Sequence, residues 1–178
     1  MSFAWGRAAG AALAGLMVLS ACGDRASDNN ADAQKQAEAS AYFLASNARA
    51  EGIRTTESGL QYKVIASGPE DGIQPDTNDL VRVEYEGSLT NGSVFDSSYT
   101  RGAPAVMSPQ ELVPGWTEAL QMMRPGDEWL LYVPPALGYG EDGRPPSIPG
   151  NSVLVFRVKL LAVAPAPGGH RGVGTANG

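Results

Sequence analysis

Residues 81–96, VRVEYEGSLTNGSVFD, carry the clearest structural pattern of the chain. Over residues 81–86 apolar side chains alternate with charged ones, which predicts a strand with one buried face. The pair Asn91-Gly92 predicts a tight turn, because both residue types accept positive φ angles. The chain then returns through residues 94–96, so the whole stretch predicts an antiparallel hairpin.

Apolar and polar residues also alternate in three other segments, which predicts three further strands. They cover residues 60–65, 128–133 and 153–163. Between the strands, Trp116, Leu120 and Met123 recur at helical spacing, and Pro114 suits the first turn of such a helix. One short helix can cover the apolar face of one antiparallel sheet, so we expect an α+β domain over residues 58–164.

The chain around this domain changes composition. Residues 22–33 are small and polar without a hydrophobic period, which predicts a flexible tether. Residues 34–57 begin with Ala, Gln, Lys and Glu, which favour a helix that Gly52 then stops. Because one apolar stripe is not stable alone in water, we expect this helix to pack on the domain. Residues 165–178 are poor in bulky side chains and predict a disordered tail.

The N-terminal segment carries the features of an export signal. In residues 1–21 a single basic residue, Arg7, precedes an apolar run that is too short for a comfortable membrane span. The run ends Leu19-Ser20-Ala21-Cys22, which resembles the lipobox of bacterial lipoproteins. The sequence therefore predicts lipidation of Cys22 and a membrane-anchored protein that faces the periplasm, with Gly23 favouring the outer membrane. An ordinary secretion signal followed by an incidental cysteine is the alternative.

Charge and composition exclude several classes of function. The formal net charge of the 178 residues is −6 and no cluster of Lys and Arg occurs, which argues against nucleic-acid binding. The one histidine, His170, lies in the predicted tail, and the one cysteine serves the anchor, so we expect no metal site, no cofactor and no nucleophilic triad. Glu84 and Glu86 are conceivable as a catalytic carboxylate pair, but a solvated strand face is the usual meaning of this pattern.

Aromatic residues are concentrated in the parts of the domain that are bounded by predicted loops. They are Tyr85, Phe95, Trp116, Tyr139 and Phe156. Core packing is the simple explanation for such rings. Tyr139 differs, because Gly138 and Gly140 flank it in a long loop where a large ring has little core to fill. We therefore expect its hydroxyl to be offered to a bound molecule.

Six short motifs follow one another in residues 58–163. They are Val83-Glu84-Tyr85-Glu86-Gly87, Val94-Phe95-Asp96-Ser97-Ser98, Val113-Pro114-Gly115-Trp116, Gly138-Tyr139-Gly140, Ile148-Pro149 and Leu154-Val155-Phe156-Arg157-Val158. In this order and at this spacing they resemble the FKBP-type peptidyl-prolyl isomerases. Residues 43–62 also look like exported bacterial members such as the macrophage infectivity potentiator group. Members of that group often dimerise through a longer helical stalk, whereas one helix is available here, so we expect a monomer.

The resemblance implies a twisted antiparallel sheet wrapped around the short helix, with an apolar pocket between them. The residues implied to act on the substrate are Tyr85, Phe95, Asp96, Trp116, Tyr139 and Phe156, and those implied to bind it are Arg101, Met107, Leu112, Val113 and Ile148. Trp116 is the implied floor of the pocket. Tyr139 and the Val113 N–H are the implied donors to substrate carbonyls, and Asp96 is the implied partner of Arg101. Met107 stands where members often have Phe, and Arg144 and Ser147 change the loop at the rim.

The implied activity is cis/trans isomerisation of X–Pro bonds in exported polypeptides, which assists folding in the cell envelope. No bond is broken, so no nucleophile is needed, and an apolar pocket favours the twisted imide over the planar one. The implied ligands are proline-containing polypeptides and, as inhibitors, macrolides such as tacrolimus or rapamycin. Two alternatives stay open: a prolyl-recognising chaperone or scaffold module with vestigial activity, and a purely structural lipoprotein.

Overall fold

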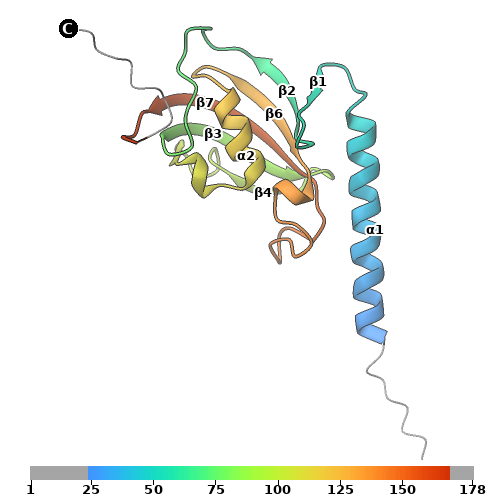
Figure 1. Ribbon diagram of the computed structural model, residues 1–178. Coiled ribbons are helices and arrows are strands. Elements are labelled where there is room, and N and C mark those ends of the chain that lie inside the picture. Colours follow the sequence, from blue (N-terminus) through green and yellow to red (C-terminus); the bar gives the residue numbers. More distant parts are fainter. Residues whose placement is uncertain (1–23, 169–178) are drawn as a thin grey trace, which may run out of the picture.

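The computed structural model describes residues 24–168 of the chain (Figure 1). A long helix, α1 (Asp24–Asn47), stands beside a domain built on a sheet. The predicted signal peptide and the predicted lipidation site at Cys22 lie outside the described residues, and so does most of the predicted tail.

One antiparallel sheet forms the body of the domain. Its strands are β1 (Ile53–Thr55), β2 (Gln61–Ala66), β3 (Leu80–Leu89), β4 (Val94–Ser97), β5 (Ala105–Met107), β6 (Glu128–Val133) and β7 (Leu154–Ala164). Their spatial order is β1-β2-β6-β7-β3-β4, and β5 also pairs with β3. The helix α2 (Pro114–Met122) lies against the sheet, and two 3₁₀ turns, η1 (Pro109–Glu111) and η2 (Pro135–Leu137), complete the elements (Figure 1). The predicted α+β fold, a sheet around one short helix behind an N-terminal helix, is confirmed.

The hydrophobic core lies where α2 packs on the sheet. Alternate residues of the strands point into it, as the period of two predicted. The buried side chains include Trp129, Leu131 and Val133 from β6, Leu154, Phe156, Val158 and Leu160 from β7, and Trp116, Ala119 and Leu120 from α2. Gly115 allows the close approach of α2 to β6, because a Cβ there would lie 2.7 Å from Cγ1 of Val133.

The predicted hairpin joins β3 to β4, but its turn differs from the one expected. Gly92 has a φ of 85°, whereas Asn91 keeps a negative φ. The N–H of Leu89 donates to the carbonyl of Ser93 (2.9 Å), and the N–H of Gly92 donates back to Leu89 (2.9 Å), so three residues form the loop. The Asn91 side chain accepts from the N–H of Ser93 instead (2.9 Å), which is the usual role of Asn in such turns.

Helix α1 begins earlier than the sequence predicted. Residues 24–33, predicted as part of a flexible tether, are helical. The alanines of this stretch are strong helix formers, and Asp32 lies 3.7 Å from Lys35, one turn further on.

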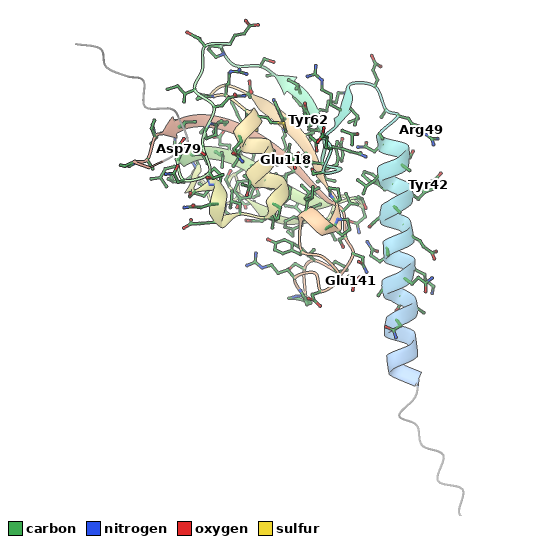
Figure 2. All side chains as sticks on the ribbon, viewed as in Figure 1. Tyr42, Arg49, Tyr62, Asp79, Glu118 and Glu141 are labelled. Atoms are coloured by element: carbon green, nitrogen blue, oxygen red, sulfur yellow. The ribbon has the colours of Figure 1, made fainter. Side chains whose placement is uncertain are left out.

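The C-terminal half of α1 packs on the domain, as predicted. The ring of Phe43 contacts that of Tyr132 in β6, with centroids 6.0 Å apart. Gln61 links the two parts, since its amide donates to the carbonyl of Leu44 (2.9 Å) and accepts from the side chain of Asn47 (2.9 Å). Tyr42 points away from the domain and is 79% exposed (Figure 2).

Three short segments differ from the expected organisation. β1 follows the helix stop at Gly52, where no strand was predicted, and it pairs with β2. β5 was not predicted as a strand, and it pairs with β3. Residues 165–168, predicted as part of a disordered tail, stay attached, because the N–H of Ala166 donates to the Asp79 carboxylate (2.9 Å). The side-chain amide of Asn78 also donates to Pro167 (3.2 Å).

Candidate functional site

A cavity of about 860 Å³ opens between α2, the sheet and the loop that follows η2. Its lining comes from β3, β4, β5, η1, α2, β7 and residues 138–151, which we name the rim loop. The lining residues are Tyr85, Phe95, Asp96, Met107, Glu111, Leu112, Val113, Trp116, Tyr139, Arg144, Pro145, Pro146, Ser147, Ile148 and Phe156. Segments that are far apart in the sequence therefore meet at one opening.

Four aromatic rings form the apolar part of the cavity and pack edge to face. Tyr85 and Trp116 have centroids 5.2 Å apart at an interplanar angle of 85°, and Trp116 and Phe156 have centroids 5.2 Å apart at 88°. Phe95 meets Phe156 at 5.6 Å and 87°. Perpendicular packing of this kind stabilises aromatic pairs beyond the area they bury. The rings are therefore held in fixed orientations around the space they enclose.

Asp96 and Tyr85 form the polar side of the cavity together with Arg101. The Tyr85 hydroxyl donates to Oδ2 of Asp96 (2.5 Å), and Arg101 forms an ion pair with Oδ1. Arg101 also donates to the Tyr85 hydroxyl (2.8 Å), and its guanidinium lies 5.2 Å from the centre of the Tyr85 ring. Both carboxylate oxygens are thus engaged, which fixes Asp96 as a charged group at the edge of an apolar space.

This network changes the ionisation of its members. Burial raises the pKa of Asp96, but the hydrogen bonds from Tyr85 and Arg101 outweigh burial and hold that pKa below its ordinary value. Burial and the hydrogen bond to Asp96 raise the pKa of the Tyr85 phenol. At neutral pH the carboxylate is charged and the phenol is neutral, so neither group changes its protonation state there.

The start of α2 offers a backbone donor to the cavity. Val113 is the residue before the helix, and Pro114 occupies its first position. The carbonyl of Val113 accepts from the N–H of Trp116 (2.9 Å), whereas no hydrogen bond among residues 24–168 uses the N–H of Val113. Val113 itself is one of the residues that line the cavity.

The rim loop brings Tyr139 and Arg144 to the opening. Arg144 and Ile148 exchange two backbone hydrogen bonds (2.8 and 3.0 Å), which folds the loop into a small hairpin. The Arg144 guanidinium donates to the Tyr139 hydroxyl oxygen (3.5 Å) and lies 5.9 Å from the centre of its ring. Because the hydroxyl oxygen is the acceptor in this contact, the contact does not use the Tyr139 O–H proton.

Ten of the eleven residues predicted to act on or bind the substrate line this cavity. Arg101 is the exception, and it reaches the site through Asp96 and Tyr85. The sequence reasoning missed Glu111, Pro145 and Pro146, which also line it. It also missed the function of Gly87, whose missing Cβ leaves room for two of the rings. Residues 24–168 contain no group of three or more His, Cys, Asp or Glu side chains that could hold a metal ion.

The fold and cavity define the class of the protein: a small α+β domain with a cavity walled by aromatic rings. Residues 72–161 match the family model described as FKBP-type peptidyl-prolyl cis-trans isomerase. Residues 12–64 match the model of the domain amino terminal to FKBP-type peptidyl-prolyl isomerase. The chain therefore belongs to the FKBP-type peptidyl-prolyl cis-trans isomerase family, and the resemblance seen in its six motifs is confirmed.

Individual relatives agree with this assignment. The peptidyl-prolyl cis-trans isomerase Mip of Coxiella burnetii is 50% identical over 127 residues, which are 71% of this chain and 54% of the relative. The crystal structure of FkpA from Escherichia coli has a TM-score of 0.74 at 39% identity, covering 80% of this chain and 65% of that one. A crystal structure of a peptidyl-prolyl cis-trans isomerase from Pseudomonas syringae has a TM-score of 0.69 at 31% identity, covering 74% of this chain and 96% of that one. The chain spans about half the length of the curated relatives it matches.

Proposed function

We propose that this protein catalyses cis/trans isomerisation of X–Pro peptide bonds. The observation that carries the proposal is the cavity itself: Trp116 and the rings perpendicular to it line it together with Val113 and Tyr139. A prolyl ring is apolar and carries no N–H, so it fits an aromatic enclosure without leaving a donor unpaired. The carbonyls on either side of it need partners, and the Val113 N–H and the Tyr139 hydroxyl supply them.

The chemistry requires only that the cavity bind the twisted imide better than the planar one. Resonance holds the peptide planar with a barrier of about 18–20 kcal/mol, and the uncatalysed X–Pro exchange takes roughly 10–100 s. Planar resonance separates charge between the carbonyl oxygen and the nitrogen, and an apolar cavity solvates that separation poorly. The twisted form has lost part of this charge separation, so its transfer from water into the cavity costs less free energy. Each tenfold gain in rate needs about 1.4 kcal/mol of this preference.

The polar groups of the site have supporting functions in this mechanism. Asp96 is already bonded through both oxygens, so it acts as a fixed charge and an orienting group for Tyr85, not as a proton acceptor. Tyr139 and Val113 hold the flanking carbonyls while the bond between them rotates, which removes part of the entropy cost of reaching the twisted state.

Replacement of Phe95 tests the proposal. Phe95 is half-buried, so its truncation disturbs the cavity wall more than the fold. We expect Phe95→Ala to lower kcat/KM on a short X–Pro peptide by about tenfold, equivalent to about 1.4 kcal/mol, in an assay without a coupling protease. Tyr62→Ala is the matched control, because Tyr62 is a half-buried aromatic that stacks on Trp129 away from the cavity. A wild-type protein that binds the peptide without accelerating its exchange would identify a prolyl-recognition module instead.

We also propose that the protein acts on exported polypeptides at the cell envelope, held there by a lipid on Cys22. The support is the segment Leu19-Ser20-Ala21-Cys22 behind an apolar run. One relative, the outer membrane protein MIP of Legionella longbeachae, is 39% identical over 142 residues. Within residues 24–168, no helix has the length and apolar character needed to span a bilayer. Cys22→Ser should move the protein from the membrane to the soluble fraction, and continued membrane association would contradict lipid anchoring.

Macrolides such as tacrolimus or rapamycin are further ligands that we propose for the same cavity.

We also propose that the protein is a monomer, supported by the packing of Phe43 of α1 on Tyr132 of its own domain. Light scattering coupled to gel filtration tests the oligomeric state, and a mass of two chains at micromolar concentration would contradict it.

A further inference from the structure

Helix α1 makes a direct contact with the rim loop of the cavity. The Ser40 hydroxyl donates to the backbone carbonyl of Asn151 over 2.5 Å, and Ser40 is only 5% exposed. The side-chain amide of Asn151 reaches back to the carbonyl of Ala33 (3.3 Å), two helical turns away. The last residue of the rim loop is therefore bonded to α1 at two points, over more than 100 positions of sequence. In Figure 1 this loop, orange, lies on the side of the domain that faces α1.

Asn151 has an unusual backbone conformation at this contact. Its φ is 58°, and among the described residues no other residue except glycine has a positive φ. Asn tolerates this conformation better than most residues, but it still costs free energy that the surrounding contacts must offset. The N–H of Asn151 donates to the carbonyl of Gly140 (2.8 Å), so Asn151 closes the base of the loop beside Tyr139.

The hydrogen bonds of the rim loop divide into those within the loop and those that attach it to the rest of the chain. Most of them join one part of the loop to another, as between Arg144 and Ile148 or from the Gly143 N–H to the Tyr139 carbonyl. Within residues 24–168, hydrogen bonds connect the loop to three other parts of the chain. Gly138 and Gly140 donate to Pro135 of η2. The Ser152 hydroxyl donates to the Pro149 carbonyl (2.7 Å), and Asn151 is bonded to α1. The loop is thus a folded unit held by the burial of Ile148 (3% exposed) in the core and by its bonds to η2, Ser152 and α1. Of these attachments, the one to α1 comes from outside the domain.

We propose that α1 supports the substrate site from outside the cavity, with Ser40 as a positioning residue that holds the rim loop so that Tyr139 can donate to the substrate. This inference rests on the proposed isomerase activity and names a part of the chain outside the cavity that the activity depends on. Ser40 does not line the cavity, so it acts through Asn151, Gly140 and Tyr139.

The substitution Ser40→Ala removes the hydroxyl and retains a good helix former. Ser46→Ala is the matched control, because Ser46 is an exposed serine of the same helix. We expect Ser40→Ala to lower kcat/KM by about fivefold, the factor that one net hydrogen bond is typically worth, and Ser46→Ala to leave it unchanged. In a Tyr139→Phe background the Ser40→Ala substitution should have almost no further effect, since both changes remove the same contact to the substrate.

Hydrogen exchange of the full chain tests the anchoring without any reference to activity. Ser40→Ala should speed exchange of the amides of residues 139–151, above all that of Asn151, and leave the core amides of β6 and β7 as they are. Unchanged exchange in the rim loop, or effects of Ser40→Ala and Tyr139→Phe on kcat/KM that simply multiply, would overturn the inference. An inactive wild-type protein would overturn the proposed function, while the exchange result would still decide whether α1 anchors the loop.

Discussion

Gly87 in β3 and Phe156 in β7 are register partners, and a Cβ on Gly87 would lie 2.6 Å from Cε1 of the Phe156 ring. The same Cβ would lie 2.8 Å from Cε2 of Phe95. Both distances are far inside van der Waals contact, and both rings belong to the cavity wall. The perpendicular pair of Phe95 and Phe156 therefore exists because position 87 has no side chain.

Gly87→Ala should consequently deform the cavity. The backbone of Gly87 has no positive φ, so the substitution acts through the two rings and not through backbone strain. We expect a loss of about 1–3 kcal/mol in the free energy of unfolding, as for other overpacked core sites, measured by urea denaturation. The isomerase rate should fall at temperatures where the variant is still fully folded.

Gly92→Ala separates the effect on stability from the effect on the isomerase rate. Gly92 has a φ of 85° and nothing within 4 Å of its missing Cβ, so alanine there strains the backbone and touches no ring. We expect a loss of stability on the order of 1 kcal/mol with normal turnover. If Gly87→Ala also kept normal turnover, the ring geometry would not matter for the rate.

The sequence predicted the fold because most of its strands bury one face and leave the other in water. Alternation over residues 81–86 and 128–133 follows directly from that asymmetry. β1 and β5 have three residues each, too few to show a period, and their pairing with β2 and β3 decides their conformation. The start of α1 was missed for a different reason, since small polar residues are compatible with a tether and with a helix alike.

The candidate site could be predicted only in part from the residues themselves. Tyr139 between two glycines indicated a ligand contact, but no local pattern shows that β3, α2 and the rim loop meet at one cavity. The resemblance to a known family predicted that these segments meet at one cavity. It did not supply the contact between Ser40 and Asn151, because a bond over this sequence separation follows from the packing of α1 and from no motif.

Arg101 should matter for activity more than for stability. It is half-exposed, and exposed ion pairs contribute little to folding, so Arg101→Ala should leave the melting temperature nearly unchanged. The same change frees one oxygen of Asp96 and removes a donor from the Tyr85 hydroxyl. We expect a several-fold lower kcat/KM on an X–Pro peptide.

Arg157→Ala is the matched control for Arg101→Ala. Arg157 is also exposed and pairs with Glu128, but neither residue lines the cavity. Equal effects of the two arginine substitutions on kcat/KM would show that the contact of Arg101 with Asp96 has no part in the reaction.

Asp96 should make the protein less stable in acid. Its pKa is lowered in the folded state, chiefly because the hydrogen bonds from Tyr85 and Arg101 outweigh burial. A carboxyl group whose pKa is lower in the folded state than in the unfolded chain stabilises the folded state. This stabilisation is fully present above the unfolded pKa of about 3.9 and is lost as the pH falls through the folded pKa. Unfolding by urea from pH 7 down to pH 2 should show Asp96→Asn less stable than wild type at pH 7, with the difference shrinking below about pH 4. A difference that stays constant over this range would contradict a charged Asp96 in the folded site.

Tacrolimus should stabilise the folded domain if it occupies the cavity. A ligand that binds only the folded state at about one hundred times its dissociation constant adds about 2.7 kcal/mol to the free energy of unfolding. For a domain of this size that corresponds to a rise in melting temperature of roughly 5–10 °C, measured by calorimetry or by the fluorescence of the buried tryptophans. Phe95→Ala should reduce the rise at the same tacrolimus concentration, because Phe95 forms one wall of the cavity, whereas Tyr62→Ala should leave it unchanged. An active wild-type protein whose melting temperature does not respond would show that the cavity accepts prolyl peptides and rejects the macrolide.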